Sequence, residues 1–186
     1  MVDEKRTAAA IRELLLAVGE NPDREGIKET PERVARMYTE LLAGYDENAA
    51  AHLKKTFPSD AKGIVLEKDI PFYSLCEHHM LPFYGKVHIA YLPEGRVAGL
   101  SKLARVTEVF ARRLQLQERM TGQIADALMH ELAPRGVMVV IEAEHMCMTM
   151  RGIKKPGTKT LTIETRGAFE NDEDLVRRVM EMIRYE

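Results

Sequence analysis

The sequence has little cysteine, little net charge and no long apolar run, and each shortage narrows the choice of function. Its 186 residues carry a formal net charge of −2, so we expect no general attraction to nucleic acid. The longest apolar runs, residues 14–18 and 137–141, are far too short to span a membrane, and residues 1–6 lack the apolar core of a signal peptide. We therefore expect a cytoplasmic protein with neither a nucleic-acid nor a membrane partner.

Length and composition predict one globular domain with an appendage. Helical periodicity runs through the first part of the chain and stops at residues 57–63. It predicts a helix ending at Gly19, a second helix N-capped by Thr30 with Pro31 behind it, and a weaker helix over 46–57. Residues 1–60 thus form an expected helical arm, whose apolar stripes need a partner surface from this domain or another subunit.

Residues 61–186 have a different pattern. Strands are predicted over 64–75 and 83–92, then a helix capped by Ser101 and a helix around 120–132, then strands over 137–148 and 160–169. A last helix opens at Asp172. The order ββααββ predicts an α+β fold with an antiparallel four-stranded sheet and helices on one face.

The two cysteines both stand beside histidine. Cys76 is followed by Glu77, His78 and His79, and Cys147 follows His145 by two residues. Thiolates and imidazoles are zinc ligands, and with no third cysteine the set suits a catalytic site with three protein ligands and an open position. Residue type leaves open whether His78 or His79 binds the metal. The alternative, a disulfide, is disfavoured because a domain of this size needs no covalent cross-link for stability and a cytosolic chain keeps its thiols reduced.

Several ordered motifs resemble the GTP cyclohydrolase I family. They are residues 30–38 (TPERVARMY), 76–79 (CEHH), 99–102 (GLSK), 115–119 (QLQER) and 144–147 (EHMC) with Arg151 and Gly152 after it. The resemblance implies the tunnelling fold, in which the four-stranded sheets of several subunits join into a barrel. It also implies a homo-oligomer, typically a decamer, with active sites between subunits, and conversion of GTP to 7,8-dihydroneopterin triphosphate and formate.

The resemblance also implies roles for individual residues. Cys76, His79 and Cys147 are the implied Zn²⁺ ligands, and His78 and His145 the implied acid/base groups. These roles fit the chemistry, because zinc activates water near neutral pH and histidine exchanges protons in the same range.

Substrate contacts are implied as well. Gln117 and Glu118 are the implied guanine contacts, and a carboxylate suits the adjacent N1–H and 2-amino donors of guanine. The implied triphosphate ligands are Arg33, Ser101, Lys102, Arg105 and Arg151. We expect Lys102 and Arg105 to share a helix face beside an N-cap at Ser101.

Two other functions are compatible with parts of the pattern. Another tunnelling-fold enzyme acting on a pterin or deazapurine would share the sheet but lack this cysteine pair. A non-catalytic zinc-stabilised assembly would bind nucleotide without releasing formate. One departure from the family, Ile163 and Glu164 where many relatives have small residues, concerns local packing or an interface.

Overall fold

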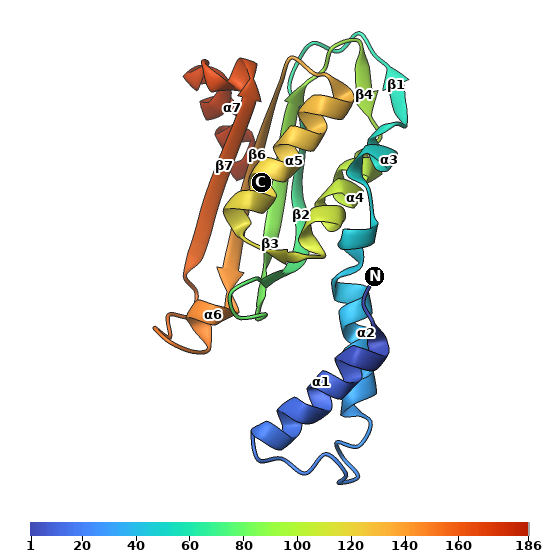
Figure 1. The fold of residues 1–186 in the computed structure, drawn as a ribbon. Helices are drawn as coiled ribbons and strands as arrows, with labels where there is room; N and C mark the ends of the chain where they lie inside the picture. Colours follow the sequence, from blue (N-terminus) through green and yellow to red (C-terminus); the bar gives the residue numbers. More distant parts are fainter. Residues whose placement is uncertain (186) are drawn as a thin grey trace.

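The computed structural model describes residues 1–185 as a helical hairpin joined to an α+β body (Figure 1). The helices are α1 (Glu4–Ala17), α2 (Thr30–Leu41), α3 (Ala49–Leu53), α4 (Leu100–Ala111), α5 (Gln117–Leu132), α6 (Met146–Thr149) and α7 (Glu173–Arg184), with 3-10 turns η1 (Ala43–Asp46) and η2 (Ala168–Glu170). The strands are β1 (Thr56–Pro58), β2 (Val65–Cys76), β3 (Pro82–Leu92), β4 (Arg96–Ala98), β5 (Leu114–Gln115), β6 (Gly136–His145) and β7 (Lys159–Gly167).

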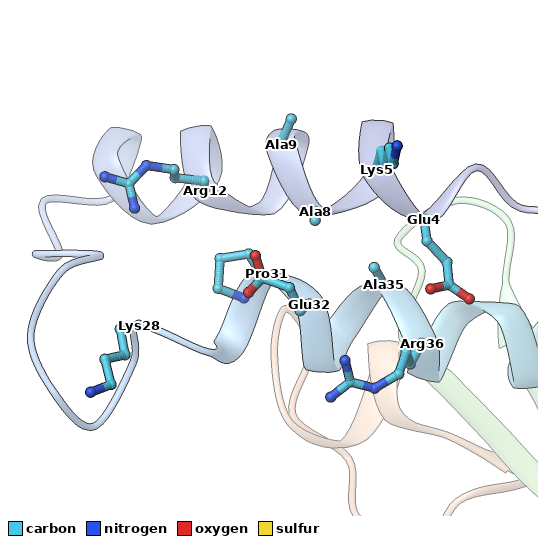
Figure 2. Close-up of a pocket in the computed structure, with 10 residues that line it drawn as sticks. All are labelled: Glu4, Lys5, Ala8, Ala9, Arg12, Lys28, Pro31, Glu32, Ala35 and Arg36. Atoms are coloured by element: carbon cyan, nitrogen blue, oxygen red, sulfur yellow. The ribbon is translucent and has the colours of Figure 1, made fainter.

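The hairpin of α1 and α2 projects from the body (Figure 1). Gly19 follows α1 at a φ of +85°, a left-handed conformation that suits glycine. The N-cap of α2 is Glu29 rather than the expected Thr30, because Thr30 is already helical. Small side chains between the two helices, Ala8 on α1 and Ala35 on α2, leave a groove of about 390 Å³ with charged residues along its rims (Figure 2).

The main sheet has the strand order β5-β2-β3-β6-β7. Strands β2, β3, β6 and β7 pair antiparallel, as the pattern predicts. The two-residue strand β5 adds a fifth, parallel member, because the chain between α4 and α5 passes along β2 at Leu75 and Cys76. This places the start of α5 beside the end of β2.

The sheet buries both faces over part of its area. Helices α4 and α5 cover one face over the main core. Helix α7 packs on the other face over Ala90, Leu92, Met138 and Val140, so the expectation of helices on one face only is wrong. The physical reason lies in β6, whose residues 137–141 are all apolar and alternate between the two cores, so both faces of the strand need a covering layer.

Two local predictions are also corrected, and a third is confirmed. The helix expected over 46–57 is confined to α3, and β1 follows it and pairs with β4. The strand expected to reach Met148 ends at His145, opposite Phe83, because β3 begins at Pro82 and proline has no N–H for a longer ladder. Asp172 caps α7 as predicted, its carboxylate accepting from the Leu175 amide.

Within residues 1–185, no helix combines the length and apolar character needed to cross a membrane.

Candidate metal centre and substrate site

A tight turn between β2 and β3 carries the first cysteine and both neighbouring histidines. The Cys76 amide donates to Leu81 O at 2.8 Å, and Cys76 O accepts from the amides of His79 at 3.3 Å and Met80 at 2.8 Å. Met80 adopts a left-handed φ of +54° as the chain reverses. The turn therefore folds His79 back toward Cys76.

Cys147 lies on α6, not on a strand as expected, so it does not share a strand face with His145. One ligand atom from each of Cys76, His79 and Cys147 lies within 4.8 Å of the others. Tetrahedral zinc with bonds of about 2.0–2.3 Å needs ligand atoms roughly 3.5–4 Å apart, so this group fits with small side-chain adjustment. Two sulfurs and one imidazole are also the donors that zinc favours.

The two thiols influence each other. Burial raises the pKa of the Cys147 thiol, and the neighbouring Cys76 raises it further, because two adjacent thiolates repel. A divalent cation between them reverses this effect, since it stabilises both thiolates. Arg151 adjoins this group, and its Nη1 donates to His79 Nε2 at 2.8 Å.

His145 is held on two sides. Its Nε2 lies 2.8 Å from Gln117 Oε1, and its ring stacks on that of Phe83 with centroids 4.8 Å apart and planes 2° apart. Burial lowers the pKa of His145, while the charge of Glu118 opposes that change. This histidine is therefore oriented and favours its neutral form.

A cavity of about 210 Å³ joins these groups. Cys76, His78, Glu118, His145 and Cys147 are among the residues that line it. His78 is exposed and lies outside the metal group, with its ring edge-on to His79 at 6.3 Å. The cavity is smaller than the roughly 300–1,000 Å³ typical of small-molecule sites, so this chain alone encloses only part of a nucleotide.

The two expected guanine contacts differ in environment. Glu118, the second residue of α5, is exposed. Gln117 is 1% exposed, and its amide is fully engaged inside the protein.

One ion pair of the site was not predicted. Arg119 on α5 forms a two-pronged salt bridge with Glu77, with Nη1–Oε2 at 2.6 Å and Nη2–Oε1 at 2.9 Å. It ties the turn after Cys76 to the start of α5, next to Glu118. Both residues lie in motifs noted in the sequence, but only folding reveals a pairing across 42 positions.

The expected triphosphate ligands are dispersed in the single chain. Ser101, Lys102 and Arg105 lie on the first turns of α4, which starts beside β4 and runs toward the turn between β2 and β3 (Figure 1). Helix α4 is about 17 Å long, and its C-terminal end leads into β5 beside Cys76, so Ser101 and Lys102 lie at the end of the helix away from Cys76 and Arg105 about one turn further along. The N-cap of α4 is Gly99, not Ser101, because β4 ends at Ala98 and leaves one extended residue.

Arg33 lies on α2 and pairs with Glu29 at 2.6 Å. The structure thus brings Arg151 to the metal group and leaves the other four expected ligands elsewhere.

The remaining histidines have local structural partners. His52 contacts Glu47 at 3.1 Å, His130 contacts Glu131 at 2.9 Å, and buried His88 accepts from the Asp69 amide at 3.1 Å.

Comparison with known proteins gives consistent matches. A model of the family described as GTP cyclohydrolase I matches residues 7–184. GTP cyclohydrolase 1 of Clostridium kluyveri is 62% identical over 183 residues, covering 98% of this chain and 99% of that protein. GTP cyclohydrolase 1 of Carboxydothermus hydrogenoformans is 62% identical over 170 residues, covering 91% and 88%. Among solved structures, apo archaeosine synthase QueF-Like aligns with a TM-score of 0.47 and 17% identity, over 59% of this chain and 97% of that chain.

Proposed function

This chain belongs to the GTP cyclohydrolase I family and is a hydrolase that acts on GTP. On this basis we propose which residues bind the metal, transfer protons and bind the substrate. Cys76, His79 and Cys147 hold a zinc ion. The observation that carries this assignment is the convergence of their three ligand atoms within 4.8 Å beside a cavity that also contains two further histidines. When bound, zinc supplies the Lewis acidity that activates water for attack on carbon near pH 7.

The reaction opens the imidazole ring of GTP at C8, releases formate and, after rearrangement of the ribose, closes the ring of 7,8-dihydroneopterin triphosphate. His78 and His145 take protons from water and deliver them to ring nitrogens. Neither belongs to the proposed ligand set, and both line the cavity. The lowered pKa of His145 suits it to accept a proton at neutral pH.

Glu118 orients the guanine. Its exposed carboxylate stands at the edge of the same cavity, where it can accept from N1–H and the 2-amino group together. Arg119 and Glu77 hold this part of α5 against the turn after Cys76 through their two-pronged salt bridge. The base is thereby placed at a set distance from the metal.

The triphosphate lies between subunits. Arg151 comes from the chain that supplies the metal ligands, and we assign Ser101, Lys102, Arg105 and Arg33 to neighbouring subunits. Two observations support this: α4 begins at the end of the helix away from Cys76, and the cavity of about 210 Å³ that one chain encloses is too small for a whole nucleotide. The outer edge of β7, nine residues long, is unpaired within residues 1–185 and could join a neighbour's sheet.

Such joining fits a tunnelling-fold barrel with ring assembly, typically a decamer. Within the expected arm of residues 1–60, the α1–α2 hairpin projects while α3 and β1 pack on the body, and residues 61–186 form the catalytic domain. The compartment is a reducing one such as the cytoplasm, because a disulfide between Cys76 and Cys147 would consume both thiolates.

Product analysis tests the proposal. Purified protein loaded with Zn²⁺ is incubated with GTP, and formate and the oxidised, fluorescent pterin are quantified with and without a chelator. Equal amounts of formate and pterin that disappear with the chelator are expected. Tight GTP binding with neither product would instead indicate a zinc-stabilised nucleotide-binding assembly.

A further inference from the structure

The side-chain amide of Gln117 hydrogen bonds to other protein groups, which suits a residue that orients another side chain rather than one that binds the substrate. It is 1% exposed, so each donor and acceptor of its amide needs a protein partner. Its Nε2 lies 3.0 Å from Ile141 O and 3.1 Å from Thr160 O. Backbone carbonyls only accept, so the amide nitrogen must face them and Oε1 must face the opposite way.

The neighbouring hydroxyls reinforce this orientation. Thr121 Oγ1 donates to Gln117 O at 2.7 Å and lies 2.7 Å from Thr162 Oγ1. The proton of Thr162 therefore goes to Thr121, and Thr162 accepts from Gln117 Nε2 at 3.1 Å. The reversed amide would place its oxygen against the two carbonyl oxygens of Ile141 and Thr160, which cannot donate.

The orientation of the amide determines which nitrogen of His145 carries hydrogen. Gln117 Oε1 can only accept, and it lies 2.8 Å from His145 Nε2, so His145 donates from Nε2. A neutral imidazole has one N–H, which leaves the lone pair on Nδ1. Stacking on Phe83 holds the ring plane, and a ring flip would replace this hydrogen bond with a C–H contact.

We infer that Gln117 is a positioning residue that keeps His145 in the tautomer with hydrogen on Nε2, so that Nδ1 exchanges protons with the substrate. This inference rests on the proposed role of His145 in proton transfer. It assigns the side chain of Gln117 to His145 and leaves Glu118 as the side chain that recognises guanine.

The tautomer can be observed directly. In wild-type protein labelled with ¹⁵N-histidine, the His145 signals are identified by their loss in His145→Ala. We expect hydrogen on Nε2 and an unprotonated Nδ1. Hydrogen on Nδ1 would overturn the inference. Because this measurement uses the wild-type protein, it does not depend on whether a Gln117 variant folds.

Kinetics separates a positioning role from a substrate contact. Gln117→Met keeps the length of the side chain and removes its hydrogen bonds. We expect kcat to fall about 10²-fold or more, as for loss of an acid/base group, with KM for GTP and metal content little changed. Gln123→Met on the same helix is the matched control, since Gln123 bonds to Gln115 rather than to His145, and it should keep the wild-type kcat.

A double mutant provides the test that a purely structural role would fail. In His145→Ala, Gln117→Met should cost no further activity, because Gln117 acts through His145. A multiplicative loss would overturn the inference, as would a Gln117→Met enzyme with raised KM and normal kcat. Normal turnover by His145→Ala would also overturn it while leaving zinc-dependent ring opening intact. Absence of formate from the wild-type reaction would instead overturn the proposed function.

Discussion

The choice of His79 over His78 as the metal ligand gives the sharpest prediction. His79 belongs to the group of three ligand residues whose atoms lie within 4.8 Å, and His78 does not. Zinc sites with four protein ligands bind with about 10–16 kcal/mol, or roughly 2.5–4 kcal/mol per ligand. At about 1.4 kcal/mol for each factor of ten, His79→Ala should weaken zinc binding by about 10²–10³-fold.

The same loss should appear in stability. With zinc well above the dissociation constant, a 10²–10³-fold weaker site loses about 2.7–4.1 kcal/mol of metal-dependent stabilisation. For a chain of 150–250 residues this lowers Tm by about 5–15 °C. Competition with a coloured chelator measures the affinity, and thermal unfolding with and without zinc measures the stabilisation.

His78→Ala should bind zinc like the wild type, and His130→Ala serves as the matched control because His130 is exposed, hydrogen bonds to its neighbour Glu131 and lies outside the metal group. Loss of zinc from His78→Ala together with its retention by His79→Ala would show that the ligand has been misassigned.

Four further predictions follow from the structure. His145→Ala should retain zinc, measured by metal analysis, and lose about 10²–10⁴-fold in kcat; a variant without zinc would mean that ligand and catalyst are exchanged. Glu118→Gln should raise KM for GTP about 10- to 100-fold, because guanine then loses the charged carboxylate that accepts from its N1–H and 2-amino group. An unchanged KM would show that Glu118 does not recognise the base. Burial lowers the pKa of His88 below its usual 6.5, so the unfolded chain binds more protons between that lowered pKa and about 6.5. The free energy of unfolding should therefore fall as pH drops through this window, and urea titrations should show a smaller pH dependence in His88→Gln. Gly85→Ala should destabilise by about 1–3 kcal/mol or more, since its Cβ would lie 1.9 Å from Glu142 O across the β3–β6 ladder, and wild-type urea unfolding would contradict this geometry.

Much of the fold could be predicted from periodicity. Alternating and continuous apolar runs predicted the four antiparallel strands, and apolar residues at helical spacing predicted the main helices. Short elements were missed or misplaced, namely β1, β4, β5 and α6. Two to four residues carry too little pattern to identify a strand or a turn of helix, and their conformation depends on the strand or chain end beside them.

The candidate metal centre could be predicted from the sequence for a different reason. Both cysteines lie within two residues of a histidine, and the chemistry of those side chains indicates zinc without any coordinates. The strand expected at Cys147 was wrong, yet the proposed ligand set is unaffected, because Cys147 on α6 still reaches Cys76.

The sequence by itself determined the fold class and the chemical character of the site, since both depend on residue type and spacing along the chain. Only the tertiary structure decided which polar residue is buried and what it contacts. Gln117 and Glu118 are adjacent and both border the cavity, but Gln117 is buried and its side chain hydrogen bonds to residues 24 and 43 positions away, whereas Glu118 is exposed. The hydrogen bonds of Gln117 form because three elements, α5, β6 and β7, pack together in the tertiary structure. A local sequence pattern cannot predict contacts between elements so far apart in the chain.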